Sequence, residues 1–149
     1  MSEVMIELRE VLVLARLRSL GNRVLRHFAT VLAEVTPVEG RIPFYSAVNA
    51  APISGEELDA AYWFENLRNP VRFEEAIQAL LADGHGVFVE CSAHPVLTPG
   101  IEDTAQGSGS PVVVTGTLRR DEGGWPRFAH SLAQLWAHGV PVDWSTLLP

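Results

Sequence analysis

Two apolar runs, each bounded by turn-forming residues, constrain the fold of this chain more than any other feature. They are GVFVECS at 86–92 and PVVVTGTL at 111–118. Continuous runs of this kind are typical of strands that are buried on both faces. Helical patterns flank them at 71–84 and 124–139. Because such strands alternate with helices, we expect an α/β fold with a parallel sheet of few strands flanked by helices.

The segment before these runs predicts one more strand and further helices. IPFYSAVNA at 42–50 is rich in aromatic and β-branched residues, which indicates a buried strand. Ser54 and Glu57 have the spacing of a capping box, so we expect a helix from there to about Leu67. Apolar periodicity predicts two helices within residues 3–35 and a short one near 95–105. Three strands are few for such a sheet, so part of a larger domain is missing or another chain completes it.

Composition narrows the class of protein. Lys and Arg number 11 and Asp and Glu number 18, which gives a formal net charge of -7. This balance argues against nucleic acid as a partner and against an anionic membrane surface. No stretch reaches the roughly 18 apolar residues that span a bilayer. The single cysteine fits a reducing compartment, so we expect a cytoplasmic protein.

Cys91, Ser92 and His94 lie close together in ECSAHPVL and raise the question of a nucleophile with its base. On a strand, Cys91 would point into a packed layer and behave as an inert hydrophobe. Ser92 and His94 are neighbours in sequence, which rarely gives the geometry that a general base needs. A reactive thiol and a Ser92–His94 pair are therefore the less favoured alternatives. No serine elbow, phosphate loop or metal-binding spacing occurs, so we expect neither a metal nor a cofactor.

Four motifs carry a resemblance to a known family: RIPFYSAVN, YWFENLRNPVRF, FVECSAHPVL, and the tail from GTLRRDEGG to GVPVDW. From Arg41 onward, the chain resembles the C-terminal part of an acyltransferase domain of a modular type I polyketide synthase. The resemblance implies part of an α/β-hydrolase-like core at 41–118 and a linker that follows the acyltransferase at 119–149. Residues 1–40 would form a helical segment outside this resemblance.

The resemblance implies a transfer of malonyl or methylmalonyl groups from an acyl-CoA to an acyl carrier protein, beside a ketosynthase domain. It also implies a serine nucleophile, a histidine base and a carboxylate-binding arginine, all upstream of the matched motifs. The histidine would fall near Leu17, where none is present, so no catalytic residue is assigned. Asn66, whose backbone carbonyl would orient that histidine, is assigned a supporting role, as are Ser92 and His94.

The leading hypothesis is therefore an acyltransferase fragment that is inactive by itself. A non-catalytic module that forms homo-oligomers is one alternative, because an incomplete sheet leaves an edge that invites pairing. One half of a split transferase is another, with the serine on a separate polypeptide. A thiol enzyme that uses Cys91 is the weakest.

Overall fold

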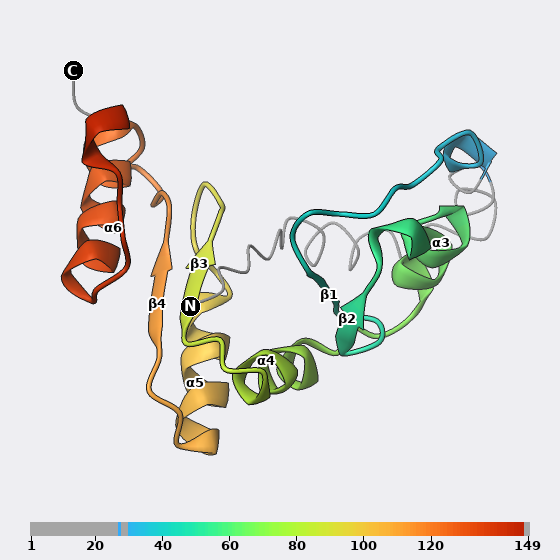
Figure 1. The fold of residues 1–149 in the computed structure, drawn as a ribbon, viewed down its shortest axis with the longest axis horizontal. Helices are drawn as coiled ribbons and strands as arrows, with labels where there is room; N and C mark the ends of the chain where they lie inside the picture. The colour runs from blue at the N-terminus through green and yellow to red at the C-terminus, as the bar shows by residue number, and fades with distance from the viewer. Residues whose placement is uncertain (1–26, 28–29, 148–149) are drawn as a thin grey trace. The chain divides into compact units, whose positions relative to one another are not determined.

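A computed structural model describes residue 27 and residues 30–147 of the chain (Figure 1). The chain divides into two compact units, one that ends at His85 and one that begins at Gly86. The helix expected at 3–20 lies outside the described residues, as do positions 23–26, 28 and 29 of the one expected at 23–35; residues 30–32 are helical.

The first unit is built on a small hairpin. Strands β1 (Phe44–Ser46) and β2 (Ala51–Ile53) pair antiparallel, with Tyr45 opposite Pro52. The backbone N–H of Ala50 donates to the carbonyl of Ser46 at 2.8 Å and closes the turn. The strand predicted within 42–50 is present as β1, but its expected place in the parallel sheet is wrong, because the segment folds back and pairs antiparallel with the residues that follow it. The elements are β1 (Phe44–Ser46), β2 (Ala51–Ile53), the 3-10 turn η1 (Gly55–Glu57), α3 (Ala60–Arg68) and α4 (Phe73–Ala82).

Two caps begin the helical part of this unit. The capping box is confirmed: the Ser54 hydroxyl accepts from the N–H of Glu56 at 3.2 Å, and Glu57 accepts from the N–H of Ser54 at 2.8 Å. It begins only η1, however. The Asp59 carboxylate then accepts from the N–H of Tyr62 at 2.9 Å and begins α3. The single helix expected from Ser54 is therefore a turn followed by a separate helix, since each cap satisfies its own set of free N–H groups.

The second unit contains the two strands that the valine-rich runs predict. β3 (Val87–Glu90) and β4 (Val113–Gly116) are parallel, with Glu90 opposite Gly116. The connection between them is α5 (Thr98–Ser108), which ends at Gly109 in the left-handed conformation. This is the βαβ unit expected of an α/β fold. α6 (Trp125–Ala137) and the 3-10 turn η2 (Trp144–Thr146) follow.

The two faces of β4 have different neighbours. Thr115 donates to Gln134 of α6 at 3.1 Å, and the Ser131 hydroxyl of α6 donates to the carbonyl of Gly116 at 2.7 Å. Gly116 turns its own α-carbon towards Pro95, since a β-carbon there would lie 2.8 Å from that ring. Neighbouring residues of a strand point to opposite faces. α6 therefore covers one face of β4, and the HPVL loop before α5 covers the other.

Candidate functional site

The carboxylate of Glu90 is the most heavily hydrogen-bonded side chain of the second unit. Glu90 ends β3 and is 3% exposed. Its Oε2 accepts from the backbone N–H groups of Val96 at 3.0 Å, Leu97 at 2.8 Å and Thr98 at 3.2 Å. These N–H groups lie at the N-terminus of α5, where the helix has free donors and favours negative charge. Glu90 therefore caps α5 from the neighbouring strand.

Ser92 belongs to the same network. Its hydroxyl donates to Oε1 of Glu90 at 3.0 Å, and its backbone N–H donates to the Thr117 hydroxyl at 3.2 Å. Thr117 in turn donates from its backbone N–H to the carbonyl of Glu90 at 2.9 Å. These bonds tie the ends of the two parallel strands together. The Ser92 hydroxyl is thus occupied by a structural carboxylate.

His94 holds the loop after β4. Its Nδ1 accepts from the backbone N–H of Arg120 at 3.3 Å. A ring that accepts at Nδ1 carries its proton on Nε2 when it is neutral. The hydrogen bonds of Ser92 and His94 thus go to different partners, which does not support a Ser92–His94 nucleophile pair. Cys91 lies half-buried next to Ser92.

Asn66 lies in the first unit, near the C-terminal end of α3. It is 9% exposed, and its Oδ1 has no hydrogen-bond partner among the described residues. Four positions further on, where a helix would supply a donor to the Asn66 carbonyl, the residue is Pro70, which has no N–H. Asn66 therefore has a side-chain oxygen without a partner among the described residues, and a backbone carbonyl to which position 70 supplies no N–H.

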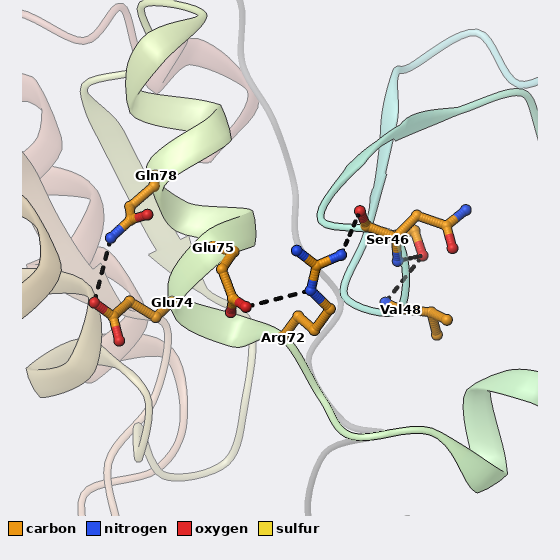
Figure 2. A network of polar contacts seen from close by, with 7 residues as sticks. Ser46, Val48, Arg72, Glu74, Glu75 and Gln78 are labelled. Atoms are coloured by element: carbon orange, nitrogen blue, oxygen red, sulfur yellow. Dashed lines mark hydrogen bonds and ion pairs between the residues drawn. The ribbon is translucent and has the colours of Figure 1, made fainter.

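A polar network fixes the turn of the β1–β2 hairpin. The buried Ser46 hydroxyl accepts from the N–H groups of Val48 at 3.1 Å and Asn49 at 3.2 Å. The Tyr62 hydroxyl of α3 donates to it at 3.0 Å. Figure 2 shows Arg72 between this turn and α4, where its guanidinium donates to the Asn49 carbonyl at 3.1 Å and to Glu75 at 3.3 Å. The tyrosine and the second arginine of YWFENLRNPVRF therefore serve the fold.

Sequence reasoning missed Glu90, Thr117 and Ser46 as organising residues. The signal for Glu90 was present, because an acidic residue at the end of a buried strand needs partners. No described group of His, Cys, Asp and Glu side chains is arranged to hold a metal ion. Within residues 30–147, none of the helices is both long and apolar enough to cross a membrane.

Comparisons with known proteins agree with the motifs. Residues 19–142 match the family model described as acyl transferase domain. The chain is 50% identical over 121 residues to polyketide synthase GfsB of Streptomyces halstedii, and 46% identical over 122 residues to pikromycin polyketide synthase component PikAII of Streptomyces venezuelae. These matches cover 80% and 81% of this chain but 2% and 3% of the two relatives.

Solved structures give the same result for the fold. The acyltransferase domain from module 8 of the salinomycin polyketide synthase matches with a TM-score of 0.81 and 48% identity, over 92% of this chain and 31% of that one. A loading acyltransferase from the avermectin modular polyketide synthase matches with a TM-score of 0.73 and 42% identity, over 79% of this chain and 36% of the other. The α/β fold class is therefore confirmed, and the chain spans about a third of these solved chains.

Proposed function

Because this chain belongs to the acyl transferase domain family of modular polyketide synthases, we propose that it forms the C-terminal part of an extender-unit transferase. In this proposal, a malonyl-type group passes from the thioester sulfur of an acyl-CoA to a serine oxygen. A thiol of an acyl carrier protein then takes it from the serine. A histidine accepts the proton of each attacking group and returns it to each leaving group. The division into 1–40, 41–118 and 119–149 and the cytoplasmic location belong to the same proposal.

The observation that carries the proposal is that the side chains of Ser92 and His94 bind different partners and not each other. The Ser92 hydroxyl donates to Glu90, and the Nδ1 of His94 accepts from Arg120. A nucleophile needs its base within hydrogen-bond reach. Neither side chain is arranged for this, so we place the serine and histidine of the reaction on the part of the domain that precedes these motifs. The 149 residues alone then transfer no acyl group.

Asn66 is the residue of this chain that we propose to act on the reaction. Its backbone carbonyl lies near the negative end of α3, and Pro70 supplies no N–H to it. An acceptor of this kind can hold one nitrogen of an imidazole and leave the other to act as base, as the acid does in a Ser-His-Asp triad. Asn66 would then set the tautomer of the catalytic histidine. Ser92 and His94 keep supporting roles through the network around Glu90.

The test is the intact mass of the pure chain after incubation with malonyl-CoA and with methylmalonyl-CoA, with and without a carrier protein. We expect no adduct and no loading of the carrier. An acyl adduct that maps to Ser92 or Cys91 would falsify the proposal. A second arm adds the N-terminal part of the salinomycin module 8 acyltransferase domain, which precedes the matched region. Acylation of its serine and loading of the carrier only when both parts are present would support the assignment. Sedimentation at several concentrations tests for homo-oligomers in the same sample.

A further inference from the structure

The side-chain oxygen of Asn66 is a buried acceptor for which the described residues supply no donor. The residue is 91% buried, since 9% of its surface is exposed, and Oδ1 lacks a partner among residues 30–147. Buried polar side-chain atoms are nearly always paired, and an unpaired one destabilises the fold. The other buried atom of this kind in the described residues is Nε of Arg127, whose residue is only half-buried. Asn66 is thus the stronger sign of a missing partner.

The side-chain donors nearest to Asn66 in sequence lie against other groups. The Tyr62 hydroxyl donates to Ser46 at 3.0 Å, and the indole N–H of Trp63 donates to the carbonyl of Leu58 at 2.9 Å. The amide of Asn69 donates to Glu65 at 2.9 Å, and the guanidinium of Arg68 lies 5.5 Å from the ring centre of Phe64. None of these side chains donates to Oδ1, so we look for its partner outside this helix.

We infer that Asn66 is a positioning residue whose side-chain oxygen receives an N–H or O–H donor from the serine-bearing N-terminal part of the acyltransferase domain. The inference rests on the proposed function. It concerns the amide oxygen and not the backbone carbonyl that would orient the histidine. The donor pins the side chain, and the carbonyl of the same residue is held in place as a result. One residue then joins the two parts of the domain and sets the catalytic geometry.

The test compares the chain alone with the chain bound to a probe. The probe is the N-terminal part of the salinomycin module 8 acyltransferase domain, titrated into the full 149-residue chain. Asn66→Leu keeps the branched shape of the side chain and removes the acceptor together with the amide N–H groups. Gln78→Leu, on the exposed side of α4, is the matched control. Urea unfolding of each variant without the probe reports on the local role of the side chain.

We expect Asn66→Leu to be as stable as the parent or more stable when alone, because an unpaired buried acceptor has been removed. We expect it to bind the probe about 10-fold more weakly or worse, because the incoming donor is then buried without a partner. Asn66→Asp keeps an oxygen at this place and should bind more tightly than the leucine variant. Gln78→Leu should match the parent in both measurements.

Several results would overturn the inference. If Asn66→Leu binds the probe as tightly as the parent does, no donor of the probe bonds to the side-chain oxygen. Asn66→Leu that is clearly less stable when alone means that the amide serves its own unit. These results leave the proposed function standing as long as the parent chain binds the probe and supports acyl transfer. Failure of the parent to bind overturns both.

Discussion

Removal of the Glu90 carboxylate should destabilise the second unit through the N-terminus of α5. In Glu90→Ala, the N–H groups of Val96, Leu97 and Thr98 lose their acceptor. A lost acceptor costs about 1–3 kcal/mol for each buried donor. These bonds are only partly buried and Val96 is 48% exposed, so water can replace some of them. We therefore take the lower limit for each donor, which gives a loss of about 3 kcal/mol in the free energy of unfolding.

Glu90→Gln separates charge from shape. An amide oxygen in the place of Oε2 can still accept from Leu97 and Thr98, and the Ser92 hydroxyl can turn to accept from the new NH2 group. Charge-assisted hydrogen bonds are about twice as strong as neutral ones, and a negative charge at a helix N-terminus contributes up to about 1 kcal/mol. The expected loss is therefore about 1–2 kcal/mol.

Urea unfolding followed by tryptophan fluorescence measures both losses, since Trp125, Trp136 and Trp144 lie in the second unit. With a slope of about 1–2 kcal/mol per molar urea, Glu90→Gln should lower the midpoint by roughly 1 M. Glu102→Gln is the control, because it removes an exposed carboxylate from α5 itself. It should change the free energy of unfolding by less than about 0.5 kcal/mol. The reasoning is refuted if the two glutamine variants have the same midpoint.

Three further outcomes follow from single positions. Gly116→Ala places a β-carbon 2.8 Å from a proline ring and should cost about 1–3 kcal/mol in urea unfolding, whereas Gly107→Ala, which meets no atom within 4 Å in α5, should leave stability unchanged or raise it. Ala50→Gly relieves a φ of 54°, worth about 1–2 kcal/mol, and loses about 0.4–1 kcal/mol to the greater freedom of the unfolded chain, so its urea midpoint should stay level or rise. The hydrogen bond from Tyr45 to Asp83 raises the pKa of the phenol from 10.0 to about 12, so its contribution to stability is complete below pH 10 and lost as pH rises through 12. Tyr45→Phe should abolish that part of the alkaline loss, which unfolding curves at pH 9 to 12 can measure.

The elements predicted best are those whose pattern is local and repetitive. The valine-rich runs form β3 and β4, and the segment with apolar periodicity at 124–139 forms α6. A continuous apolar run indicates a strand buried on both faces, and helical spacing of apolar residues indicates a helix buried along one side. β2 was missed because it contains Pro52, and proline in a short segment argues against a strand. The strand exists because Pro52 lies opposite Tyr45 in a two-stranded hairpin, where a missing N–H is tolerated.

The sequence pointed to residues of the site but did not predict which hydrogen bonds they make. Ser92 and His94 stood out in the sequence, yet their partners Thr117 and Arg120 lie 25 and 26 residues away. The crossover through α5 brings these segments together, and no local pattern encodes that approach. Glu90 was given no role in the sequence analysis, and the N–H groups that it binds come only six to eight residues later, where the chain enters α5.

The residues of the family motifs differ in whether their hydrogen-bond partners lie within the described chain. In FVECSAHPVL, Glu90 caps α5, Ser92 bonds to Glu90, and His94 holds the loop at Arg120. These hydrogen bonds lie within the second unit and connect the end of β3 to α5 and to the loop after β4. Asn66 differs, because its buried oxygen has no partner within the described residues. A buried acceptor without a partner is unfavourable in a unit that is complete, and it becomes favourable once a second part supplies a donor. Experiments on the function of this chain should therefore begin at α3, where the buried oxygen of Asn66 lacks a partner among the described residues.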